Sequence, residues 1–150
     1  MKSTLHKVFV SPELNLGVFS FLVHFAWEIL QMPLFGGVQE ARYLDVLFMC
    51  LLATFGDVAI VLTAFWVVAW RTPAGRRWLG FPTVPQVAGF TLVGVLITIF
   101  IEIVATKVWE RWSYGELMPV IPFLDVGLSP LLQWALLSPL IVWFVHRQVR

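Results

Sequence analysis

This chain of 150 residues is 59% hydrophobic and only 13% charged, whereas roughly 25% of the residues in a soluble domain are charged. Its formal net charge of +1 gives no reason to expect nucleic acid as a partner. A single cysteine, Cys50, excludes an intrachain disulfide and a cysteine metal cluster. Because the charges cluster between long apolar runs, we predict one all-α domain, an integral membrane four-helix bundle that covers residues 1–150.

The first predicted span covers residues 16–34. A basic stretch precedes it, as in a signal peptide, but no small-x-small cleavage site follows, so we expect this helix to be retained. His24, Glu28 and Gln31 are spaced at i, i+4 and i+7 and therefore share one face of the helix. Because this face carries a carboxyl group, we expect it to face the interior of the bundle and not the lipid.

The second and third predicted spans, residues 44–70 and 84–108, also carry acids. Asp57 follows a glycine, which would allow another helix or a ligand to approach closely. Glu102 lies one turn after Thr98, on the same side of the third helix. Each of these spans therefore adds a polar group to a helix that is otherwise apolar.

The fourth predicted span covers residues 126–145 and carries Gln133. The connection before it, KVWERWSYGELMPVIPFLD, is rich in aromatic residues. Pro119 and Pro122 indicate an irregular turn within it. Two interpretations stay open: an aromatic belt at the membrane surface, or a re-entrant or surface helix that covers a cavity.

The basic residues predict how the bundle is oriented. With four spans, the start of the chain, the middle connection and the end of the chain lie on one side of the membrane. The basic residues on that side are Lys2, Lys7, Arg71, Arg76, Arg77, Arg147 and Arg150, against Arg42, Lys107 and Arg111 on the other. The positive-inside rule then predicts a multi-pass protein of the inner membrane with both termini in the cytoplasm.

The polar groups of separate spans fall at similar depths. Glu28 lies roughly 18 Å from the cytoplasmic end of its span, and Asp57 and Gln133 roughly 20 Å from theirs, at about 1.5 Å of rise per residue. Glu102 lies nearer the other surface, at roughly 27 Å. Short connections between antiparallel helices would bring these groups together. Because a carboxylate at the centre of a span costs roughly 2.5–3.5 kcal/mol to insert, we expect each acid to be partnered, protonated or bound to a cation.

We therefore predict a pocket inside the membrane that is lined with carboxyl groups. The candidate catalytic residues are Glu28, Asp57 and Glu102. The candidate ligand-binding residues around them are His24, Trp27, Gln31, Thr98 and Gln133. No metal site is predicted, because the spacing of these groups along the chain is not a recognised ligand signature, and the identity of any cofactor stays open.

Three hypotheses for function stay open. Aromatic walls suit a lipophilic small molecule such as an isoprenoid, quinone or carotenoid, with acid/base chemistry of the isomerase, hydratase or cyclase kind. A non-catalytic subunit or assembly factor of a larger membrane complex would use the polar groups only to join helices. A proton-coupled transporter or ion pathway would act as a homodimer and alternate its carboxyl groups between proton and cargo. Membrane lipids are expected partners in every case.

Four short motifs stand out: HFAWEILQMP at 24–33, ATFGD at 53–57, WSYGELMPVIP at 112–122 and GLSPLLQ at 127–133. Together they resemble an uncharacterised family of small bacterial polytopic membrane proteins. The resemblance implies a shared fold and no particular activity. The chain is also similar in size and tryptophan content to membrane-bound carotenoid cyclase domains. Those domains rely on a proline followed closely by paired acids, whereas MPVIPFLD offers a single acid, Asp125.

Overall fold

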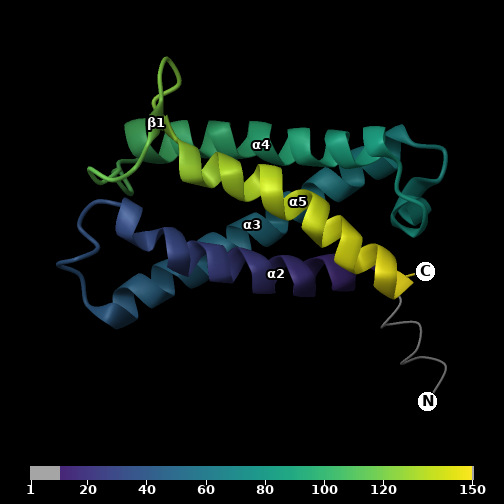
Figure 1. Ribbon diagram of the computed structural model, residues 1–150, viewed down its shortest axis with the longest axis horizontal. Coiled ribbons are helices and arrows are strands. Elements are labelled where there is room, and N and C mark those ends of the chain that lie inside the picture. Colours follow the sequence, from purple (N-terminus) through teal and green to yellow (C-terminus); the bar gives the residue numbers. More distant parts are fainter. Residues whose placement is uncertain (1–10, 150) are drawn as a thin grey trace.

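The computed structural model describes residues 11–149, which form four long helices that run alternately in opposite directions (Figure 1). The helices are α2 (Pro12–Gln31), α3 (Tyr43–Arg71), α4 (Val84–Lys107) and α5 (Leu128–Val149). Each helix packs against the next in the chain, and α5 packs against α2, so that the bundle closes on itself. Lys2, Lys7 and Arg150, which enter the charge count above, lie outside the described residues.

All four helices are long and apolar enough to cross a membrane, α2 together with the short 3-10 helix η1 (Met32–Leu34). The prediction of four apolar helices in a helical bundle is therefore confirmed. The helix starts follow from local sequence. Pro12 occupies the first turn of α2, where its missing N–H costs no hydrogen bond. Thr83 and Gln86 form a reciprocal capping box at the start of α4.

The bundle has two ends that differ in their connections. We call "loop end" the end at which residues 35–42 join α2 to α3 and residues 108–127 join α4 to α5. We call "terminal end" the opposite end, where α2 begins, α5 ends and the 3-10 helix η2 (Gly75–Gly80) lies between α3 and α4. There, Arg76 pairs with Glu13 at 2.7 Å between Nη2 and Oε2.

The apolar core fills the terminal half of the bundle. Phe65, Trp78 and Phe90 are fully buried and pack as neighbouring rings, with centroids 6.1 Å and 5.9 Å apart. Buried polar side chains lie mainly in the loop half, where Glu28, Gln31, Thr98, Glu102, Ser129 and Gln133 are found. The packing is thus divided along the bundle axis into an apolar half and a polar half.

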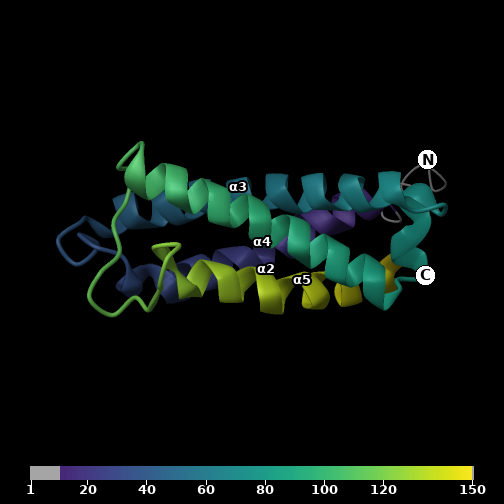
Figure 2. The same cartoon turned by 90° about the horizontal axis from the view of Figure 1, so that it is seen from above.

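Helices α3 and α4 separate toward the loop end (Figure 1). Near the terminal end they are close, since a side chain added at Gly89 of α4 would meet Val68 of α3 at 3.9 Å. Viewed from above, α4 crosses the bundle at an angle to α3 and α5 (Figure 2). The divergence leaves the inner faces of α3 and α4 apart at the loop end.

The connection between α4 and α5 folds back over the loop end. Tyr114 forms an isolated antiparallel bridge with Phe35. The Gly115 N–H donates to the Leu34 carbonyl at 2.8 Å, and the Gly36 N–H donates to Ser113 at 2.9 Å. A small ladder that the sequence did not predict, β1 (Val120–Ile121) with β2 (Val126–Gly127), then leads into α5.

Candidate functional site

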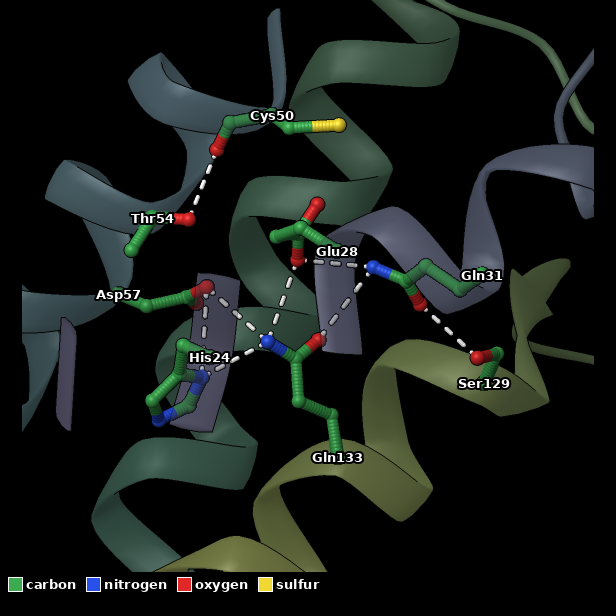
Figure 3. Close-up of polar contacts among 8 residues, drawn as sticks. All are labelled: His24, Glu28, Gln31, Cys50, Thr54, Asp57, Ser129 and Gln133. Atoms are coloured by element: carbon green, nitrogen blue, oxygen red, sulfur yellow. Dashed lines mark hydrogen bonds and ion pairs between the residues drawn. The ribbon is translucent and has the colours of Figure 1, made fainter. Parts of the chain in front are cut away.

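Polar side chains from three helices form one connected network in the loop half of the bundle (Figure 3). Its members are His24, Glu28 and Gln31 of α2, Asp57 of α3, and Ser129 and Gln133 of α5. The spacing on α2 places its three residues on one inward face, as the sequence predicts. The network joins helices that are far apart in the chain.

The side-chain amide of Gln133 is the centre of this network. Its Nε2 lies 3.0 Å from Asp57 Oδ2, 3.2 Å from Glu28 Oε1 and 2.7 Å from His24 Nδ1. An amide nitrogen has only two hydrogens, so it cannot donate to all three acceptors at once. His24 Nδ1 also lies 3.3 Å from Asp57 Oδ2, so in the tautomer with a hydrogen on Nδ1 it donates to Asp57 instead of accepting from Gln133.

Gln31 fixes Glu28 from the other side. The Gln31 Nε2 donates to Glu28 Oε1 at 2.8 Å, and the Gln31 Oε1 accepts from the Ser129 hydroxyl at 2.8 Å. The Ser129 hydroxyl can bond either end of an amide, so it is the accepting carboxyl oxygen of Glu28 that selects the Nε2 end of Gln31. Glu28 therefore receives two amide donors on the same carboxyl oxygen, one from Gln31 and one from Gln133.

The network forms one wall of a cavity of about 530 Å³, a volume typical of small-molecule sites, which span roughly 300–1,000 Å³. All three candidate catalytic acids, from α2, α3 and α4, line this cavity. The polar residues that line it are Glu28, Gln31, Asp57, Thr98, Glu102, Arg111 and Gln133. The rest of the wall is largely apolar and includes Met32, Phe35, Met49, Leu52, Ile60 and Ile101.

Glu102 is held by the connection between α4 and α5. Its Oε2 accepts from the Tyr114 hydroxyl at 2.5 Å and from the Trp112 Nε1 at 3.4 Å. Burial raises the pKa of the Tyr114 phenol above its ordinary value, and its hydrogen bond to Glu102 raises that pKa further. Trp109 and Arg111 of the same connection also line the cavity. The aromatic connection therefore covers the loop end of the cavity, although no part of it is helical.

The cavity opens sideways along α3. Met49 and Leu52 line it and yet remain 45% and 50% exposed, and Ala53 and Gly56 on the same face are exposed as well. These residues lie on the part of α3 that diverges from α4 (Figure 1). In a membrane this opening would face the hydrocarbon chains of the lipids, because both helices are long enough to span it.

Two of the predicted ligand-binding residues do not line the cavity. His24 is fully buried behind Gln133 and contacts the network only through its Nδ1. Trp27 packs against the apolar core. Successive helical residues point about 100° apart, so adjacency to Glu28 in the chain turns Trp27 away from the cavity. In contrast, Gln31, Thr98 and Gln133 do line it.

The sequence did not assign roles to Arg111 and Trp112, which line the cavity at the loop end, or to Tyr114, which donates to Glu102. The feature of the sequence that could have indicated them is the aromatic connection between the third and fourth spans. A cover over a cavity was one of its two interpretations. Within residues 11–149, no group of three or more His, Cys, Asp and Glu side chains is arranged to hold a metal ion.

No family model, curated protein or solved structure matches the chain. The resemblance to small bacterial polytopic membrane proteins therefore stays a prediction. By helix length and composition, the chain is that of a multi-pass membrane protein. Any more specific function has to be inferred from the cavity and the side chains around it.

Proposed function

We propose that this protein binds a lipophilic small molecule, such as an isoprenoid, quinone or carotenoid, in the cavity between α2, α3 and α4. The observation that carries the proposal is the meeting of Glu28, Asp57 and Glu102 at one cavity that also has an apolar wall. The polar end of the ligand would face the acids, and its hydrocarbon body would lie along α3. The side opening would let the molecule enter from the lipid.

Acid/base chemistry suits this arrangement. Glu28 is bonded to amides, Asp57 to an amide and an imidazole, and Glu102 to a phenol and an indole. Acids in different surroundings can hold their protons with different strength, so one can donate a proton while another accepts one. We propose isomerisation, hydration or cyclisation as the class of reaction, with these three acids as its catalytic residues.

The charge distribution supports an orientation for the protein. The loop end has few basic residues in the sequence, and the terminal end has more. We propose an inner-membrane location with the terminal end in the cytoplasm. The cavity would then open in the outer half of the bilayer, and the connection between α4 and α5 would cover it from the periplasmic side.

The two other hypotheses make different demands on the site. A non-catalytic subunit or assembly factor needs the hydrogen-bonded network, which joins the helices, but it needs no cavity. A proton-coupled transporter that acts as a dimer needs carboxyl groups at the axis between two copies. Convergence of the acids on a cavity inside one chain favours ligand binding over both.

Blocking the cavity tests the proposal. Ala53 and Ala59 are both exposed on α3, but only Ala53 lines the cavity. The protein is purified in mild detergent, and the small molecules that co-purify with it are identified by mass spectrometry. We expect a lipophilic molecule in the wild type and in Ala59→Trp, and its loss in Ala53→Trp. Equal amounts in both variants, or none in the wild type, would contradict the proposal.

The acids are tested in the same assay. We expect Glu28→Gln and Asp57→Asn to retain the fold and lose the co-purified molecule. Asp45→Asn is the matched control, because Asp45 is exposed near the start of α3, pairs with Arg42 and does not line the cavity. If the two cavity variants lose thermal stability and no bound molecule is found in the wild type or in any variant, the network serves only to join the helices. The proposal of ligand binding is then wrong.

A further inference from the structure

We infer that the ligand of this cavity carries a protonated primary or secondary amine at one end of its hydrocarbon body. The inference rests on the proposed function, because it names the head group of the molecule that the cavity would hold. Two observations support it. Several oxygen atoms of the lining side chains have no hydrogen-bond partner among the described residues, and most of the charged side chains around the cavity are acids.

Each of the three acids uses one carboxyl oxygen within the protein. Glu28 Oε1 accepts from two amides, Asp57 Oδ2 contacts Gln133 and His24, and Glu102 Oε2 accepts from the phenol and the indole. The second oxygens, Glu28 Oε2, Asp57 Oδ1 and Glu102 Oε1, have no hydrogen-bond partner within residues 11–149. Because all three acids line the cavity, these oxygens are free to accept hydrogen bonds from a molecule bound there.

Thr98 provides an independent indication of a ligand. A helical threonine commonly donates to the carbonyl one turn earlier, as Thr54 and Thr106 do at 2.8 Å and 2.7 Å. Thr98 lines the cavity and is only 7% exposed, but its hydroxyl has no hydrogen-bond partner in the described part of the chain. The cavity wall therefore holds a buried hydroxyl whose hydrogen bond is unmet by the described residues.

The charge around the cavity selects the head group. Three acids line it. Among the described residues that line the cavity, one is basic, Arg111, and it is exposed. An anionic head group would be repelled by the acids. A neutral hydroxyl would satisfy some oxygens but would supply no opposite charge to an ionised acid, which is costly away from water. An ammonium group donates hydrogen bonds and supplies the opposite charge at once.

The aromatic cover fits the same head group. Trp109 and Trp112 line the cavity, and Trp112 donates to Glu102. The faces of tryptophan rings attract cations. Because a quaternary ammonium can use the ring faces but has no N–H to give to the carboxyl oxygens, we expect primary and secondary amines to bind more tightly than quaternary ones.

Matched probes test the inference. The wild-type protein is placed in phosphatidylcholine nanodiscs, and stearylamine, stearyl alcohol and stearyl sulfate, each with a nitroxide on its chain, are added in turn. Saturable quenching of tryptophan fluorescence reports binding, and the part that Ala53→Trp abolishes and Ala59→Trp retains is assigned to the cavity. We expect the amine to reach half-saturation at a concentration about tenfold lower than the alcohol, a difference of roughly 1.4 kcal/mol.

The outcomes separate this inference from the proposed function. If the alcohol or the sulfate binds to the cavity as tightly as the amine, the cavity does hold a lipophilic molecule and the amine head group is wrong. If no probe gives quenching that depends on Ala53, ligand binding itself fails and the inference fails with it.

A second set of variants links the amine to the acids. We expect Glu102→Gln and Asp57→Asn each to bring the affinity for the amine close to that for the alcohol, with Asp45→Asn leaving the preference unchanged. If both cavity variants unfold at the same temperature as the wild type and keep its full preference for the amine, the acids do not recognise the head group and the inference is overturned.

Discussion

Gln133 of α5 donates a hydrogen bond to Asp57 of α3 across the centre of the bundle, with 3.0 Å between Nε2 and Oδ2 (Figure 3). In the ring of packed helices, α3 and α5 are opposite one another, and α2 and α4 lie between them. The same amide also reaches Glu28 of α2. A single side chain thus links three helices in the polar half of the protein.

Replacing this amide should destabilise the whole bundle. We predict that Gln133→Leu lowers the free energy of unfolding by about 2–4 kcal/mol, because it removes the amide from buried Glu28 and His24 and from partly buried Asp57. Gln148→Leu is the matched control, since Gln148 lies on the same helix and is exposed. Thermal unfolding in detergent, followed by circular dichroism, measures both. Equal unfolding temperatures for the two variants would show that the network contributes little to stability.

Close packing of α4 against α5 gives a second prediction. A Cβ atom added at Gly94 would overlap the ring of Trp134, whose side chain is fully buried. We predict that Gly94→Ala lowers the free energy of unfolding by about 1–3 kcal/mol, because the rigid ring has to move. Gly89→Ala, on the same helix, meets its nearest neighbour only at 3.9 Å and should be tolerated. If the two alanine variants unfold alike, α4 and α5 are packed less closely than described.

The helices and the position of the polar groups could be predicted from the sequence because both follow from local patterns. Runs of apolar residues define the four helices, and the spacing of His24, Glu28 and Gln31 defines an inward face. A rise of about 1.5 Å per residue put Glu28, Asp57 and Gln133 at a common depth, and the structure joins these three residues by hydrogen bonds.

The rest of the site depends on contacts that no local pattern records. Tyr114 reaches Glu102 only because the connection between α4 and α5 folds back and pairs with Phe35. The side opening lies where α3 and α4 diverge, whereas at the terminal end Gly89 of α4 comes so close to α3 that an added Cβ would meet Val68 at 3.9 Å. Hydropathy shows that a helix is apolar, but it does not show from which neighbouring helix it diverges.

The Tyr114 phenol should lose its proton only at unusually high pH. Burial and the hydrogen bond to Glu102 raise its pKa in the folded protein, so the stability that this group contributes is complete below its ordinary pKa of about 10 and is lost as the pH rises above that value. Ultraviolet titration of the wild type and of Tyr114→Phe, which leaves Tyr43 as the other tyrosine, isolates its ionisation by difference.

In this difference titration, we expect tyrosinate to form well above pH 10, together with loss of the fold. Formation of tyrosinate at about pH 10 in the folded protein would mean that Tyr114 is exposed to water and does not donate to Glu102. The connection between α4 and α5 would then not cover the cavity.

The shared cavity is tested most directly by an experimental density map of the protein in a lipid bilayer. We predict that the unpartnered oxygens of Glu28, Asp57 and Glu102 face one chamber, and that elongated density that does not belong to the chain extends from them toward the opening between α3 and α4. A map in which α3 packs against α4 along its whole length, with each acid in separate surroundings and no density between them, would contradict both the cavity and the function proposed for it.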